Sequence, residues 1–315
     1  GCLNTASGYN ALRSNTTASN NTAVGACSLY ANTTGAGLVA VGYNALKSST
    51  CANCSTALGH QALMDVTTGG GNTALGQATG ENITTGVANV IVGVKALCTA
   101  TVAHYNTAVG YQAQRQTTTG HCNVAFGYNS LLLNTTGCNN VGIGLNSLYN
   151  STTGKKNTAV GACALYANTT SGYNVAVGFC ALKTNTTGVA SVAIGYEALK
   201  SATTGGWQTA VGTGAMYSNT TGARNVAIGV YGLKGNTTGA SNTASGYYAL
   251  LCNSTGSCNT AVGADSLKCN TTGQPNVAVG REALTSNTTG AENVAVGAGS
   301  LEDNSTGCLN TALGR

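Results

Sequence analysis

The residue types best suited to chemistry in this chain are two histidines and two cysteines placed at a common interval. His104, His121 and Cys138 follow one another at seventeen residues, and Cys122 comes directly after His121. Imidazole nitrogens and thiolate sulfurs are the ligands that Zn²⁺ prefers, usually in a tetrahedral arrangement. These four residues are therefore a candidate zinc site if the fold stacks residues seventeen apart, and exposed turn residues are the alternative.

The chain contains 13 cysteines, and two further pairs show the same interval. Cys163 and Cys180 are seventeen residues apart, and so are Cys252 and Cys269. Adjacent parallel strands lie about 4.8 Å apart, which is a Cα separation that a disulfide accepts. The spacing predicts that disulfides could join each pair, and free cysteines used as small side chains are the alternative.

Asparagine offers a third kind of chemistry, because eleven Asn-x-Ser/Thr sequons occupy the same place in the sequence period. They are Asn15, Asn32, Asn134, Asn168, Asn185, Asn219, Asn236, Asn253, Asn270, Asn287 and Asn304. Such sequons can accept N-linked glycans on the surface of a secreted protein. Identical asparagines stacked in a column can instead hydrogen-bond to one another as an amide ladder. Both interpretations are open from the sequence.

All these spacings come from one internal repeat. With Asn4 as position 1, a phrase of the type Asn-Thr-Ala-Val-Gly returns every 17 residues up to residue 310, without insertion or deletion. Gly occupies position 5 in all 19 copies, and Leu occupies position 9 in 15 of 18. A fixed period of this size indicates stacked structural units. We expect a single β-solenoid repeat domain over residues 1–315, as a fragment of a longer array.

The pattern within one repeat predicts an all-β coil with two short strands, and about 18 such coils. β-branched residues at positions 2 and 4 flank Ala at position 3, which is typical of a short strand. All Lys, Arg, Asp and Glu fall at positions 6, 7, 10, 11, 16 or 17, so these must be exposed corners. We expect positions 2, 4 and 9 in the core, with the position 3 alanines pressed against a second sheet or a second subunit.

The composition excludes several classes of function. Charged residues make up only 7% of the chain and the net charge is +5, so no nucleic-acid surface is indicated. No apolar run is long enough for a membrane-spanning helix. No catalytic set recurs in register, and we expect neither an enzyme nor a cofactor. The low charge and the many Gly, Thr, Ala and Val residues are typical of a solenoid or fibrous protein.

Two phrases carry a resemblance to known proteins. Residues 106–113 read Asn-Thr-Ala-Val-Gly-Tyr-Gln-Ala, and Asn-Thr-Thr-Gly closes many repeats. Together they resemble the repeats of phage tail-fibre and bacterial surface fibre proteins. Residues 191–195, Ser-Val-Ala-Ile-Gly, resemble the head repeats of trimeric autotransporter adhesins. This resemblance implies a β-roll or β-solenoid, often trimeric, in an extracellular or virion-surface fibre.

The sequence favours a structural protein that forms an extracellular filament or fibre shaft by self-association, as a homotrimer or by end-to-end stacking. One alternative is an adhesin or tail-fibre module that recognises surface glycans through Tyr, Gln and Asn at the corners. Another is ice binding, because position 14 is Thr in 16 of 18 repeats and could form a regular uncharged face.

Overall fold

The computed structural model describes all 315 residues and contains 19 strands and no helix. Each strand has three residues and occupies positions 2 to 4 of one repeat. The model divides into two compact units, Gly1–Lys156 and Asn157–Arg315, which are built from the same coil. This confirms the predicted all-β solenoid with a 17-residue period. The expectation of a single domain stays a prediction.

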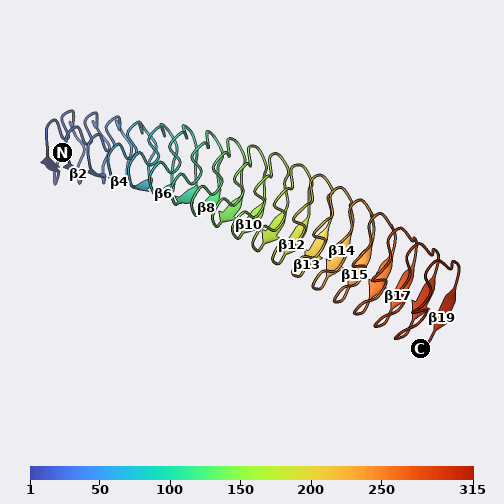
Figure 1. Ribbon diagram of the computed structural model, residues 1–315. Coiled ribbons are helices and arrows are strands. Elements are labelled where there is room, and N and C mark those ends of the chain that lie inside the picture. Colours follow the sequence, from blue (N-terminus) through green and yellow to red (C-terminus); the bar gives the residue numbers. More distant parts are fainter. The chain divides into compact units, whose positions relative to one another are not determined.

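The strands of each unit follow one another in chain order (Figure 1). The first unit contains β1 (Thr5–Ser7), β2 (Thr22–Val24), β3 (Val39–Val41), β4 (Thr56–Leu58), β5 (Thr73–Leu75), β6 (Val90–Val92), β7 (Thr107–Val109), β8 (Val124–Phe126) and β9 (Val141–Ile143). The second contains β10 (Thr158–Val160), β11 (Val175–Val177), β12 (Val192–Ile194), β13 (Thr209–Val211), β14 (Val226–Ile228), β15 (Thr243–Ser245), β16 (Thr260–Val262), β17 (Val277–Val279), β18 (Val294–Val296) and β19 (Thr311–Leu313).

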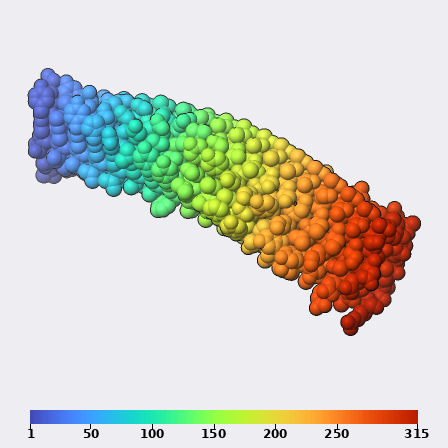
Figure 2. Space-filling model, viewed as in Figure 1, coloured from blue at the N-terminus to red at the C-terminus, as the bar shows by residue number.

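Within each unit every strand pairs in parallel with the strand of the next coil. Residues seventeen apart are direct partners, as Ala227 is of Ala244 and Ile228 is of Ser245. The same register holds in the first unit, where Ala23 pairs with Ala40. Each column of the repeat therefore places one kind of side chain above its own copies, as the period predicts. The space-filling view shows neighbouring coils of each unit in close contact (Figure 2).

The prediction of two strands per coil is wrong, because each coil contains only one. Positions 7 and 9 have left-handed backbones, with φ of 58° at Cys27 and 50° at Leu29, and this alternation prevents an extended strand. The backbone still pairs between coils: the Leu29 N–H donates to the Ala45 oxygen at 3.1 Å. A left-handed residue with a side chain costs about 1–2 kcal/mol. Burial of the leucine offsets this cost, since Leu29 is fully buried.

The strands also face the opposite way from our expectation. Ala at position 3 points into the coil, as the fully buried Ala227 shows, whereas its neighbour Ile228 at position 4 is 48% exposed. Neither a second sheet nor a second subunit is needed to cover these alanines. The interior is filled instead by the position 9 leucines and by asparagines such as Asn236, both fully buried. Only the position 9 part of the predicted core is confirmed.

The corners carry the charges, as the sequence pattern predicts. No Lys, Arg, Asp or Glu residue is buried. Placing charges at exposed corners avoids the large cost of burying an unpaired charge inside a narrow coil.

The chain forms no helix, and it therefore has no helical segment that could span a membrane.

Candidate functional site

The part of this chain best suited to binding is the solvent-facing side of its strands. We call the side chains at positions 2 and 4 of each unit the outward strand face. No charged residue occurs at either position. In the second unit its exposed apolar members are Ile194, Ile228, Val262, Val277, Val279, Val296 and Leu313. Those of the first unit are Val24, Val39, Leu58, Leu75, Val90, Val124, Phe126 and Ile143. Contiguous exposed apolar surface of this kind marks interaction sites.

Aromatic side chains at position 6 border this face. The rings of Phe179 and Tyr196 in consecutive coils stack with centroids 5.5 Å apart. In the first unit, Tyr111 and Tyr128 stack at 5.4 Å with an angle of 10° between their planes. These rings are roughly half exposed, so the columns widen the apolar surface beyond the strands. Aromatic residues are enriched at protein interfaces, because they present a large rigid area.

The position 12 asparagines form the predicted amide ladder. In the second unit the Asn236 amide donates to the Asn219 oxygen at 2.7 Å, and Asn253 donates to Asn236 at 2.8 Å. The second amide hydrogen of Asn253 goes to the backbone oxygen of Gly256 at 2.9 Å. The position 1 asparagines form a parallel column, where the Asn242 backbone N–H donates to the Asn225 side-chain oxygen at 2.8 Å. Most buried amides of these columns are thus satisfied by their own copies and by backbone oxygens, whereas the side-chain oxygens of Asn134 and Asn185 have no hydrogen-bond partner.

This ladder answers the question of glycosylation at the same residues. Nine of the eleven sequon asparagines are buried, and Asn15 and Asn304 are partly buried. The amide nitrogen that would carry a glycan donates hydrogen bonds inside the coil, as in Asn270, which donates to Asn253 and Gly273. A glycan has no room there. A glycan at the nine buried sequons is therefore incompatible with the folded coil, and glycosylation of Asn15 and Asn304 stays a prediction.

The 13 cysteines are all free thiols, so the structure contains neither predicted disulfide. Cys163 and Cys180 do lie in consecutive coils, as do Cys252 and Cys269, and each pair is close enough to interact electrostatically. Desolvation by burial raises the pKa of the Cys180 thiol, and the nearby Cys163 contributes in the same direction. The thiols act as small side chains at the corners, which is the alternative that the sequence left open.

The four candidate zinc ligands do not come together. Cys138 Sγ lies 3.5 Å from His121 Nδ1, which is a hydrogen-bond contact. His104 Nδ1 instead accepts the backbone N–H of Val87 at 3.1 Å, and Cys122 is exposed. No group of three or more His, Cys, Asp or Glu side chains is placed to hold a metal ion. The predicted tetrahedral site is therefore absent, because stacking alone brings only one pair into contact.

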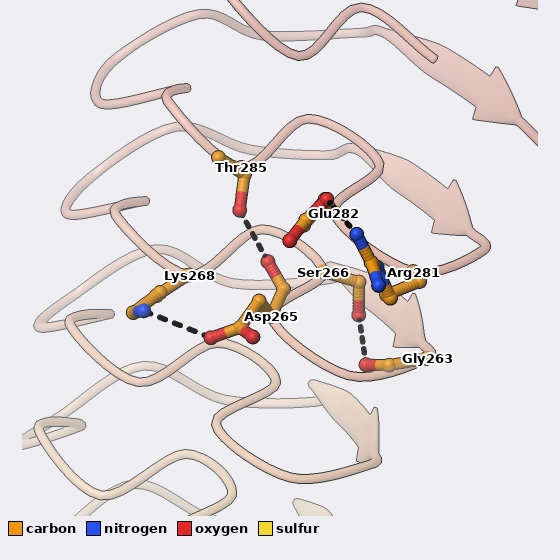
Figure 3. A network of polar contacts seen from close by, with 7 residues as sticks. All are labelled: Gly263, Asp265, Ser266, Lys268, Arg281, Glu282 and Thr285. Carbon is orange, nitrogen blue, oxygen red and sulfur yellow. Dashed lines mark hydrogen bonds and ion pairs between the residues drawn. The ribbon is translucent and has the colours of Figure 1, made fainter. Parts of the chain in front are cut away.

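Most polar contacts at the corners lie within one coil, and the contact between Thr285 and Asp265 joins two consecutive coils (Figure 3). Lys268 forms an ion pair with Asp265 at 2.9 Å, and the Thr285 hydroxyl donates to the Asp265 backbone oxygen at 2.6 Å. In the next coil Arg281 forms an ion pair with its neighbour Glu282 at 2.9 Å. Exposed ion pairs of this kind contribute about 0–1 kcal/mol each. These contacts stabilise the turns. The expectation that the chain is not an enzyme stays a prediction.

The threonines at positions 13 and 14 divide into two kinds. The position 13 hydroxyl donates to the next coil, as Thr220 does to the Thr237 oxygen at 3.0 Å. The position 14 threonines, such as Thr221 and Thr238, are exposed. The uncharged threonine face is therefore a single column, and ice binding stays a prediction.

Sequence reasoning missed the outward strand face, because it assigned positions 2 and 4 to the core. One signal could have revealed it: Thr and Val replace one another freely at position 2. A packed interior would not accept an unpaired hydroxyl in place of a methyl group. Comparison of this chain with protein-family models, curated proteins and solved structures finds no match. Its class is therefore defined by its own geometry, a β-solenoid with one strand per coil.

Proposed function

We propose that this chain is a structural protein, a β-solenoid fibre shaft whose copies associate side by side through the outward strand face. The observation that carries this proposal is that positions 2 and 4 present apolar or hydroxyl-bearing side chains and no charge in any coil. An uncharged face forms no ion pairs with a charged partner. The desolvation cost of burying it against another uncharged face is small, because neither face carries a charge into the interface.

A second copy of this chain is the partner that fits this face best. Its coils repeat at the same strand spacing, so every side-chain column can meet a matching column along the whole length of a unit. Stacked sheets pack about 10 Å apart, and β-branched side chains interdigitate well at that distance. A partner with a different repeat would lose this register within a few coils.

The available area is adequate for such an interface. Ten strands at about 4.8 Å spacing, each about 10 Å long, present about 480 Å². The adjoining columns at positions 5 and 6 add two residues to the width and raise this to about 800 Å², using about 3.3 Å per residue. A stable interface needs about 800 Å² from each partner. The second unit therefore supplies about enough surface by itself, and the first unit offers a similar face.

The test is the mass of the full chain in solution, measured by sedimentation velocity over a range of concentrations. We expect the wild-type chain to form dimers or trimers, and the double substitution Ile194→Lys with Ile228→Lys to weaken association by about tenfold or more, because like charges would face each other. The matched control is Thr187→Lys with Thr221→Lys, which adds the same charge at exposed position 14. A monomeric wild-type chain, or equal weakening by both pairs, would overturn the proposal.

We also propose that this shaft works outside the cell or on a virion surface. The support is the resemblance of its repeats to those of phage tail fibres and bacterial surface fibres. End-to-end joining of copies, the other mode of assembly that the sequence favours, stays a prediction.

A further inference from the structure

Glycine interrupts the position 7 corner column of the second unit twice, at Gly214 after β13 and at Gly299 after β18. The coil of β13 has Thr213 and Gly214 at positions 6 and 7, where most coils carry larger side chains. This interruption opens a surface pocket with a volume of about 300 Å³. The aromatic side chains of Tyr196, Tyr217 and Tyr231 line it. Sites for small ligands have volumes from about 300 Å³ upward, so this pocket suits a single compact ligand group.

The missing side chain at Gly214 determines the shape of the pocket. A Cβ atom added to Gly214 would lie 2.5 Å from the Cδ1 and Cε1 atoms of Tyr231. The Tyr231 ring therefore lies across the space that a position 7 side chain would fill. The backbone of Gly214 has φ of 61°, close to the 54–58° of the non-glycine residues Asn129 and Asn10 at position 7 of other coils. The positive φ at this position therefore does not require glycine. The effect of Gly214 is to leave space for the Tyr231 ring.

Charged groups give the pocket a distinct polarity. Glu197 at its edge forms an ion pair with Lys200 at 2.6 Å, and Lys200 also donates to the Tyr217 hydroxyl at 3.3 Å. These hydrogen bonds raise the pKa of Lys200, so it stays charged at neutral pH. Lys234 lies 4.6 Å from the Tyr231 ring centroid and forms no ion pair with a carboxylate. The lining therefore has one carboxylate, which is already paired with Lys200 from outside the pocket, and one ammonium group, Lys234, without a carboxylate partner.

We propose that this pocket binds a sugar that carries a carboxylate, such as a uronic acid residue of a glycan. The Tyr231 ring offers a flat apolar surface against which the C–H face of a pyranose can stack. Lys234 is free to pair with the sugar carboxylate, and Glu197 and the Tyr196 hydroxyl can bond to sugar hydroxyls. The ammonium group of Lys234, which no carboxylate pairs, disfavours the cationic ligands that aromatic pockets otherwise bind well.

The first experiment measures binding of methyl β-glucuronide to the full chain by ligand-observed NMR, with methyl β-glucoside and choline as comparisons. We expect the glucuronide to bind most tightly, the glucoside more weakly and choline least. Lys234→Gln should weaken glucuronide binding by about two- to fivefold, as expected for an exposed ion pair, and leave glucoside binding unchanged. Equal binding of all three probes, or preference for choline, would overturn the proposal.

Two further variants test the pocket itself. Tyr231→Ala removes the stacking surface and should reduce binding of both sugars by about tenfold. Gly214→Asn installs a residue found at position 7 elsewhere and should displace the Tyr231 ring with a similar loss. Both changes have a precedent in this backbone, since Ala78 and Asn44 occupy position 7 with positive φ. Tyr128→Ala, in a stacked pair of the first unit, is the control that should bind like wild type.

Retained sugar binding in both Tyr231→Ala and Gly214→Asn would place the sugar elsewhere and refute the assignment. This proposal goes beyond the role as a shaft and does not depend on it. Sugar binding is observed through the sugar resonances, whereas lateral association is observed through the mass of the complex. A chain that associates but binds no sugar contradicts only this inference, and a monomer that binds glucuronide contradicts only the proposed shaft.

Discussion

Ile91 occupies the space that the missing side chain of Gly80 leaves in the core. A Cβ atom at Gly80 would lie 2.7 Å from Cδ1 of Ile91 and 3.0 Å from Cδ1 of Ile83. Gly80 stands at position 9, where leucine is the rule, and Ile91 stands at position 3 of the next coil, where alanine is the rule. The two exceptions therefore compensate for each other, and the volume of the core is conserved across neighbouring coils.

The first prediction follows from this compensation. Ile91→Ala alone should cost about 2–5 kcal/mol, because it opens a cavity beside Gly80. Gly80→Leu alone should cost about 1–3 kcal/mol through overpacking against Ile91. The double substitution restores the ordinary leucine and alanine pair, so it should cost less than Ile91→Ala alone. Urea unfolding of the full chain, with hydrogen exchange of coil 72–88 as the local measurement, gives the three values.

A matched control for this cycle lies in the second unit. Leu233→Ala removes an ordinary position 9 side chain, which is fully buried, and should cost about 2–5 kcal/mol. Combining this control substitution with Ile91→Ala should lower the free energy of unfolding by more than either change alone, and neither change should offset the other. Strict additivity of Gly80→Leu and Ile91→Ala would show that the two residues do not share one space.

The sequence period was sufficient to predict the register and the columns, because a strict 17-residue repeat without insertions leaves no other way to stack the coils. It was not sufficient to predict which side of the strand faces inward. Positions 2, 3 and 4 all lack charge, so the distribution of charges that identified the corners could not separate Ala227 from Ile228. Hydrophobicity favoured the β-branched residues as the core. The narrow interior accepts alanine, or glycine at Gly142, except where Gly80 makes room for Ile91.

The absence of a second strand from each coil could not be predicted from the sequence for a different reason. Position 9 is usually leucine, which rarely adopts a left-handed backbone, yet Leu233 has φ of 53°. The regular spacing of the coils imposes this conformation, since most of these leucines donate their N–H to the next coil, as Leu233 does to Ala249 at 2.9 Å. Propensity describes a residue by itself, and here the pairing between coils outweighs it.

The second prediction concerns the amide ladder. Asn253→Ala should destabilise the chain by about 1–3 kcal/mol, because it leaves the Asn270 amide and the Asn236 oxygen without their partner. Asn253→Asp should cost more at neutral pH, since it places a carboxylate beside the Asn236 oxygen in a buried column. Thr255→Ala, at an exposed position 14, is the control and should change stability little. Urea unfolding midpoints measure all three.

The same aspartate substitution has a pH dependence of known sign. Burial raises the pKa of a carboxyl group in the folded chain above the unfolded value of about 3.9. The folded chain therefore holds the proton more tightly, and the stability from this group is lost as the pH rises through the raised pKa. The deficit of Asn253→Asp relative to Asn253→Ala should shrink on acidification. A deficit that is constant from pH 4 to 7 would contradict burial of this column.

The third prediction concerns glycosylation. When the chain is expressed through a eukaryotic secretory pathway, the buried sequons of the second unit should carry no glycan in the folded product, because their amides are bonded within the ladder. Asn304, which is partly exposed, is the internal comparison. Peptide mass spectrometry after enzymatic deglycosylation in heavy-oxygen water gives the occupancy of each site. A folded chain with glycans on Asn236 or Asn253 would refute the buried ladder.

The fourth prediction concerns the cysteines and pH. Desolvation raises the pKa values of Cys98 and Cys180, so at pH 8 each has less thiolate than a free cysteine and should react more slowly with iodoacetamide. The exposed Cys258 is the internal reference for access. Mass spectrometry of partly alkylated protein gives the relative rates. Faster alkylation of Cys180 than of Cys258 would contradict the burial that raises its pKa.

These two thiols should also make folding stability depend on pH in the alkaline range. The unfolded chain releases each thiol proton near pH 8.5, whereas the folded chain keeps it to a higher pH. The contribution to stability is therefore fully present below about pH 8.5 and is lost as the pH rises through the raised pKa. Cys180→Ala, a change with a precedent in Ala78 at the same position, should reduce this loss. An equally steep loss in Cys180→Ala would assign the effect to the tyrosines and lysines of the corners instead.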